Sequence, residues 1–111
     1  MQIGLQRHGA VTVLSPQGPI VGPDADTFRQ TATDALLRSQ GRFIVDASAI
    51  AYVDSKGLEA LLDITEKLAT SGGALKLCNV GETLREVLQL TELLAQFENY
   101  ADVNTAVRSF L

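Results

Sequence analysis

This 111-residue sequence has no tryptophan, only one cysteine, Cys78, and only one histidine, His8. A single thiol cannot form an internal disulfide, and one thiol with one imidazole cannot build a Cys/His metal site. The fold must therefore be stable without a covalent or metal cross-link, which suits a reducing compartment. We expect no metal, no cofactor and a cytoplasmic location.

Long apolar runs and an excess of positive charge are also missing. No stretch approaches the roughly 18 apolar residues that a membrane helix needs, and the N-terminus does not resemble a signal peptide. The net charge of −4 argues against nucleic acid or an anionic membrane as partner, because such binding requires a clustered basic surface. Hydrophobic residues nevertheless make up 46% of the chain, enough for one core, and we expect a single domain over residues 1–111.

Hydrophobic periodicity predicts strands alternating with helices. The chain opens with a predicted hairpin that turns at residues 7–10, followed by a Pro- and Gly-rich loop at 15–19. Further strands are expected at 43–45, at 74–78 and, more weakly, near 97–98, and helices at about 24–39, 55–70, 82–90 and from about 103.

This order of elements predicts the fold class. A strand, a crossover helix and a strand joined by tight loops imply parallel pairing with right-handed crossovers. We expect an α/β domain with a mixed, mostly parallel sheet of four or five strands, an antiparallel N-terminal edge strand and about four helices. In such sheets, function usually lies in the loops at the carboxyl ends of the strands. Residues 46–55 form one of these loops.

The loop at 46–55 leaves a predicted strand and enters a predicted helix at or beside Ser55. If Asp54 caps this helix, Ser55 is its first residue and its hydroxyl faces solvent at the positive end of the helix dipole. A phosphate there would meet unpaired backbone N–H groups. Gly57 lowers helix propensity by about 1 kcal/mol relative to alanine, so we interpret it as a point where a phosphate or a partner approaches the backbone closely. A simple cap remains the alternative.

Other polar residues favour ordinary structural roles. Asp46 and Asp54 are expected in turns and caps, His8 in an exposed turn, and Cys78 in the core as a small hydrophobic residue. No Ser-His-Asp arrangement is evident, because Ser55 lacks the flanking glycines of a nucleophile elbow. We therefore do not expect an enzyme.

The same segment resembles the STAS domain, and most closely the bacterial anti-sigma factor antagonists. The resemblance spans nearly the whole chain and rests on a strand ending in an aspartate, a short serine-containing turn, an apolar-aromatic pair and a serine motif that opens a helix. The matching residues are Asp46, Ser48, Ile50, Tyr52-Val53, Asp54-Ser55-Lys56-Gly57-Leu58, Gly18-Pro19-Ile20 and Gly72-Gly73.

The resemblance implies a phosphorylation-controlled switch. When Ser55 is unphosphorylated, such a domain sequesters an anti-sigma factor that is also a serine kinase, a histidine-kinase-like ATPase. The kinase phosphorylates the serine, the complex dissociates, and a serine phosphatase resets it. The added charge of about −1.5 to −2 would join an acidic helix face of Glu59, Asp63 and Glu66, and could weaken binding roughly 30- to 150-fold. The residues expected to support the serine or contact the partner are Asp54, Lys56, Gly57, Glu59, Asp46 and Asp24.

Two departures leave an alternative open. Many relatives have acidic residues where this chain has Pro19 and Val21, with Asp24 as a nearby substitute, and a small polar residue where it has Lys56. The lysine could pair with a phosphate or select a different partner. The alternative is an accessory or scaffold STAS protein that is never phosphorylated, such as the partner of an ABC-type lipid transporter or a component of a stress-signalling complex.

Overall fold

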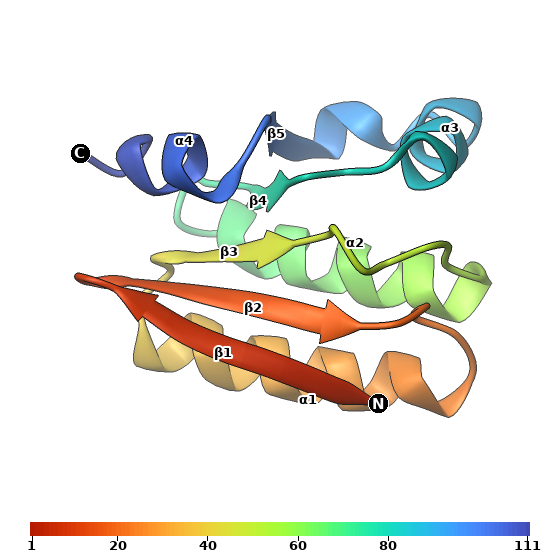
Figure 1. The fold of residues 1–111 in the computed structure, drawn as a ribbon, viewed down its shortest axis with the longest axis horizontal. Helices are drawn as coiled ribbons and strands as arrows, with labels where there is room; N and C mark the ends of the chain where they lie inside the picture. The colour runs from red at the N-terminus through yellow and green to blue at the C-terminus, as the bar shows by residue number, and fades with distance from the viewer.

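Five strands form one mixed sheet in the order β1-β2-β3-β4-β5 in the computed structural model, which describes residues 1–111 (Figure 1). Strand β1 is antiparallel to β2, and all the other neighbouring pairs are parallel. The elements in chain order are β1 (Gln2–His8), β2 (Val11–Gln17), α1 (Pro23–Arg38), β3 (Phe43–Asp46), α2 (Ser55–Ala69), β4 (Leu75–Cys78), α3 (Glu82–Leu90), the 3-10 helix η1 (Leu94–Gln96), β5 (Phe97–Tyr100) and α4 (Val103–Arg108). The predicted α/β fold with an antiparallel edge strand is confirmed.

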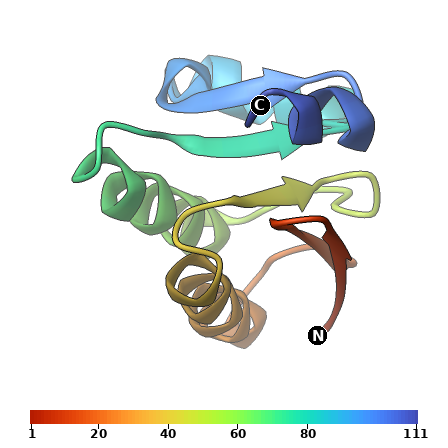
Figure 2. The same ribbon diagram turned by 90° about the vertical axis from the view of Figure 1, so that its left-hand side faces the viewer.

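Both faces of the central strands are covered, which explains their continuous apolar runs. Phe43 and Val45 of β3 belong to the main core, to which α1, α2 and α3 also contribute buried residues. Ile44, between them, points to the opposite face and packs with Ala106 of α4. The two views in Figures 1 and 2 show α1 and α2 together on one side of the sheet and α4 on the other.

Strand β2 is longer than predicted. The expected loop at 15–19 begins only after Gln17, and Pro16 lies within the strand, opposite Ile3 of β1. The proline is tolerated because β3 pairs only with residues 12–14 of β2, so no strand on that side requires the missing N–H. Pro16 therefore marks a strand position without a ladder hydrogen bond and not the start of the loop.

The hairpin turn is shorter than predicted. Arg7 and His8 belong to β1, and the turn consists of Gly9 and Ala10 alone. Gly9 has a φ of 65°, which a two-residue turn between antiparallel strands favours. His8 is exposed, as expected, but at the end of a strand.

The starts of α1 and α4 differ from each other. Helix α1 begins at Pro23 behind Gly22, which has a φ of 54° and contributes no side-chain cap. The sequence predicts that Asp24 and Asp26 start this helix; they lie in its first turn, where negative charge interacts favourably with the helix dipole. Helix α4 is capped by Asp102, whose carboxylate accepts a hydrogen bond from the Thr105 N–H.

No helix is both long enough and apolar enough to cross a bilayer.

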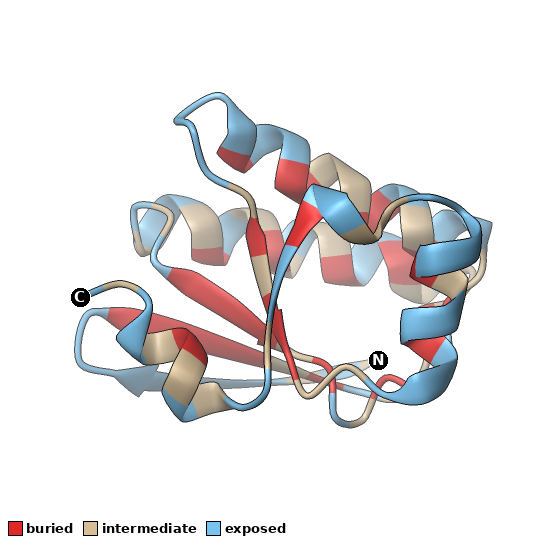
Figure 3. Ribbon diagram, turned by 90° about the horizontal axis from the view of Figure 1, so that it is seen from above, coloured by how far each residue is buried: buried red, intermediate tan, exposed pale blue.

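The buried face of α2 is rotated relative to the apolar stripe that the spacing of Leu58, Leu61, Leu62, Thr65, Leu68 and Ala69 predicts. Figure 3 shows buried positions recurring along one side of each long helix. Ala69, expected to be buried, is exposed, and Leu58 and Leu62 are only half-buried. At about 100° per residue, these three positions fall on one border of the helix face. The buried residues are Gly57, Ala60, Leu61, Ile64, Thr65 and Leu68.

Candidate functional site

The loop from β3 to α2 lies beside the connection from β2 to α1 at the carboxyl ends of the parallel strands. Ile20 and Val53 form an isolated parallel bridge between the two connections. The Ile20 N–H donates to the Tyr52 carbonyl at 3.2 Å, and the Asp54 N–H donates to the Ile20 carbonyl at 3.4 Å. These bonds extend the sheet pairing beyond the strands and hold the start of α2 in place.

Asp54 caps α2 and also binds the start of α1. Its Oδ1 accepts a hydrogen bond from the Gly57 N–H at 2.8 Å, and its Oδ2 accepts one from the Gly22 N–H at 2.9 Å. These two donors, Gly57 first, lower the pKa of the Asp54 carboxyl below its ordinary value. The carboxylate therefore joins the N-terminal ends of the two long helices.

Ser55 is the first residue of α2, as predicted, and it is exposed. Because Asp54 supplies the cap, the helix start does not need the Ser55 hydroxyl as an acceptor. The serine side chain makes no hydrogen bond within the chain, whereas the hydroxyls of Ser39 and Ser109 donate to backbone carbonyls. The geometry therefore leaves the Ser55 hydroxyl available at the surface.

Gly57 has a different explanation from the one we expected. It is buried, and the group that approaches its backbone is the carbonyl of Ile20 in the same chain. An ideal Cβ at this position would lie 2.2 Å from that oxygen, well inside any real contact. The interpretation that a phosphate or a partner approaches Gly57 is corrected: the glycine is required by internal packing.

The charges around the serine are mixed. Lys56 and Glu59 are exposed, and neither forms an ion pair. Asp63, expected on the exposed acidic face of the same helix, is half-buried and contacts both Lys67 and Arg29. The acidic face of α2 is therefore less charged than predicted, with Glu59 and Glu66 as its exposed carboxylates.

Asp46 and Asp24 lie outside the Asp54 hydrogen-bond network. The Oδ1 atom of Asp46 accepts hydrogen bonds from the Ser48 N–H at 3.0 Å and from the Asn79 side chain at 3.1 Å, which is the predicted turn role. The Asp24 carboxylate lies 3.2 Å from the amino group of Met1. Neither carboxylate bonds to the start of α2.

Cys78 is fully buried at the end of β4, as predicted. Burial and the nearby negative charge of Asp46 raise the pKa of its thiol to about 12, so it carries no thiolate near neutral pH. No three His, Cys, Asp or Glu side chains are grouped closely enough to hold a metal ion.

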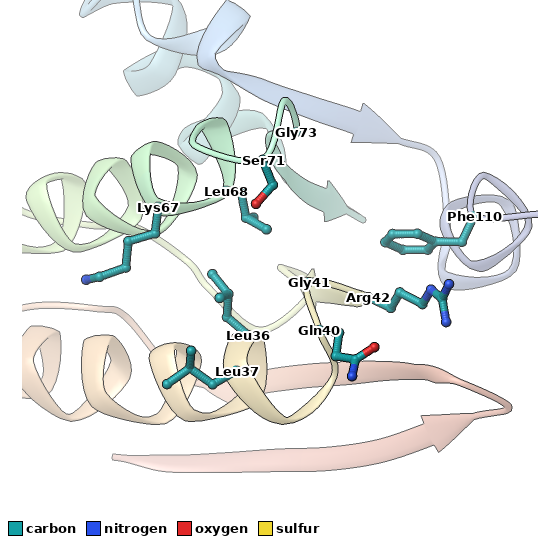
Figure 4. A pocket seen from close by; sticks show the side chains of 10 residues that line it. All are labelled: Leu36, Leu37, Gln40, Gly41, Arg42, Lys67, Leu68, Ser71, Gly73 and Phe110. Atoms are coloured by element: carbon teal, nitrogen blue, oxygen red, sulfur yellow. The ribbon is translucent and has the colours of Figure 1, made fainter.

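A cavity of about 420 Å³ lies between the C-terminal ends of α1 and α2 (Figure 4). Leu36 and Leu68 line it, and Phe110, just past α4, lies across from them. No residue of the loop at 46–55 contributes to it. This cavity is therefore separate from the Ser55 site.

Sequence reasoning did not predict how Ile20 and Gly22 position the site from a distance. Ile20 and Gly22 provide the carbonyl that excludes a side chain at Gly57 and the N–H that binds Asp54. The Gly22-Pro23 pair, directly before the predicted helix at about 24–39, indicates by itself only a break in the chain. Proline is common at the first position of a helix, so a glycine directly before it could have suggested the positive φ that Gly22 adopts.

Fold and site together define a class: a small α/β domain that presents one serine hydroxyl at the first position of a helix whose cap comes from the preceding aspartate. The chain belongs to the STAS domain family, whose model matches residues 2–106. The resemblance seen in the sequence is thereby confirmed.

Individual relatives are distant in sequence. The anti-sigma F factor antagonist of Paenibacillus polymyxa is 24% identical over 94 residues, covering 84% of this chain and 80% of the relative. The crystal structure of tm1081 from Thermotoga maritima has a TM-score of 0.87 at 22% identity, covering 96% of this chain and 92% of that one. The anti-sigma factor antagonist SpoIIAA in its unphosphorylated form has a TM-score of 0.76 at 19% identity, covering 98% and 96%. At these identities the structures establish a shared fold.

Proposed function

We propose that this domain is an anti-sigma factor antagonist whose binding to its partner is controlled by phosphorylation of Ser55. The observation that carries the proposal is the division of roles at the start of α2, where Asp54 makes the cap and Ser55 stays exposed. The curated relative from Paenibacillus polymyxa is named as an anti-sigma F factor antagonist, and SpoIIAA has been solved in an unphosphorylated and a phosphorylated form.

The proposed partners are an anti-sigma factor with serine kinase activity, of the histidine-kinase-like ATPase type, and a serine phosphatase. In the unphosphorylated state, the surface around Ser55 binds the anti-sigma factor. Tyr52, half of whose surface is exposed, and the half-buried Leu58 provide apolar area beside the serine. Exposed aromatic side chains are common anchors in protein interfaces, which supports this surface as the contact.

Electrostatics explain how a phosphate would break the complex. Phosphorylation adds a charge of about −1.5 to −2 next to the ionised Asp54 and one turn before Glu59. A partner that buries this surface must then remove water from a dianion with Lys56 as the only cation within one helical turn. We expect this cost to weaken binding roughly 30- to 150-fold.

The first experiment locates the phosphate. The chain and its Ser55→Ala variant are incubated with ATP and with each histidine-kinase-like ATPase of the host, and the products are examined by mass spectrometry. We expect one phosphate on Ser55 in the wild-type chain and none in the variant. Absence of phosphate with every kinase, together with co-purification with a transporter or a scaffold complex, would favour the accessory role.

The second experiment measures the affinity of the kinase for Ser55→Asp by calorimetry. We expect binding to weaken at least about tenfold while the melting temperature stays nearly unchanged, because the serine side chain caps nothing. Ser71→Asp is the matched control, since it adds the same charge at an exposed position beyond the other end of α2. Equal loss of affinity in both variants would mean that net charge, and not the site, controls binding.

A further inference from the structure

Strand β1 is an unprotected sheet edge. It has seven residues, every one exposed except the half-buried Ile3, and it pairs with β2 without a bulge. It contains no proline or lysine, and Arg7 is its only permanently charged residue. The other edge strand, β5, has four residues and includes Glu98. Native sheets usually protect long edges with charges, prolines or bulges, and β1 has little of this protection.

The backbone of β1 offers a defined set of outward groups. The Thr12 N–H of β2 donates to the Arg42 carbonyl beside β3, so the polar backbone groups of Thr12 face away from β1. Its partner Arg7 is then in a non-hydrogen-bonded pair, and its own N–H and C=O face outward. Because the orientation alternates along an antiparallel strand, the N–H and C=O of Leu5 and Ile3 also face outward. Pro16, which has no N–H to donate, lies opposite Ile3, as a non-hydrogen-bonded pair allows.

A second copy of β1 matches this pattern. If a two-fold axis passes through Leu5, the two Leu5 residues face each other and exchange two hydrogen bonds, and each Ile3 faces the partner's Arg7. This arrangement uses the outward N–H and C=O of all three residues in both copies. It joins two sheets of five strands into one continuous sheet.

The side chains next to this edge are also self-complementary. Leu5, 57% exposed, lines a shallow groove together with Asp34 and Arg38 of α1. Both charged residues are exposed, and neither has an ion partner within the chain. The two-fold axis sets the α1 helices side by side in opposite directions, so that each copy brings one exposed acid and one exposed base to the groove beside Leu5.

We propose that this chain forms a symmetric homodimer through antiparallel pairing of its β1 strands about Leu5. The occupant of the edge is a second copy of this chain, because the backbone pattern matches its own two-fold image and the groove beside it carries one acid and one base per copy. The proposal is independent of the Ser55 switch.

Sedimentation of the full chain from micromolar to millimolar concentration tests the dimer, with Leu5→Lys as the disrupting variant. Two lysines at the axis would place like charges directly opposite, and we expect the dimer dissociation constant to rise about tenfold or more. Leu90→Lys is the matched control, because it makes the same change at a leucine that is 78% exposed on α3. A wild-type chain that stays monomeric throughout would overturn the proposal.

Hydrogen exchange measured by NMR identifies the interface without any substitution. In the dimer, the amides of Ile3, Leu5 and Arg7 should exchange at least about tenfold more slowly at high than at low protein concentration. The amides of Gly4 and Gln6, which face β2, should be protected at both concentrations. A dimer that leaves the three outward amides unprotected uses another surface and would equally overturn the proposal.

Discussion

The carbonyl oxygen of Ile20 occupies the space that a side chain at Gly57 would need. An ideal Cβ on Gly57 would lie 2.2 Å from this oxygen and 3.0 Å from the Cβ of Val53. The same carbonyl accepts a hydrogen bond from the Asp54 N–H, so it cannot move away without losing a contact at the helix start. The close approach of these two backbones fixes where α2 begins and where Ser55 is presented.

Replacing Gly57 with alanine should destabilise the domain. Alanine improves helix propensity by about 1 kcal/mol, but the clash with a backbone atom outweighs this gain. We expect the free energy of unfolding to fall by about 1–3 kcal/mol in urea titrations. Gly4→Ala is the control, because its ideal Cβ lies 3.6 Å from the nearest heavy atoms and the change should stay within about 0.5 kcal/mol. Equal stability of the two variants would disprove the packing argument.

The stability that Asp54 provides should depend on pH. Hydrogen bonds from Gly57 and Gly22 lower its pKa in the folded state, so its contribution is present above the unfolded pKa of about 3.9. It is lost as the pH falls through the folded pKa. We therefore expect the difference in urea midpoint between the wild type and Asp54→Asn to be largest near neutral pH and to shrink below about pH 4.

A carboxylate that accepts no hydrogen bond is the control for this pH series. Glu59 lies one turn further along α2 and is exposed, and its substitution by glutamine should change the urea midpoint little. A constant difference between the wild type and Asp54→Asn from pH 7 down to about pH 2 would show that ionisation of Asp54 contributes nothing.

Thr65 should stabilise the domain through its hydroxyl. Its Oγ1 donates to the Gln96 carbonyl at 2.7 Å and accepts from the Leu75 N–H at 3.0 Å, in a position only 3% exposed. Thr65→Val has nearly the same shape but leaves a buried N–H without a partner, and we expect a loss of about 1–3 kcal/mol. Thr65→Ser keeps the hydroxyl and loses only a buried methyl group, which should lower the free energy of unfolding by about 0.8 kcal/mol. If the Thr65→Ser variant is less stable than the Thr65→Val variant, the hydroxyl does not stabilise the domain through these hydrogen bonds.

The strands and helices could be predicted where their signals are local. The apolar run at Phe43, Ile44 and Val45 indicated a strand covered on both faces, and α4 and the main core do cover them. The Asp54-Ser55 pair indicated a capped helix, and the cap is present. The position of Thr65 in the apolar stripe of α2 predicted that it is buried. It could not predict the hydrogen bonds that its hydroxyl makes with β4 and η1.

The sequence alone was sufficient for the order of elements, the family resemblance and the exposed serine at a helix start, because periodicity, caps and motifs are properties of neighbouring residues. It could not reveal why Gly57 is a glycine, that Gly22 binds Asp54 across 32 positions, or that Asp63 is paired with Arg29. These relationships join segments far apart in the chain. They exist only once the sheet brings the two connections and the two helices together, and no local pattern encodes that approach.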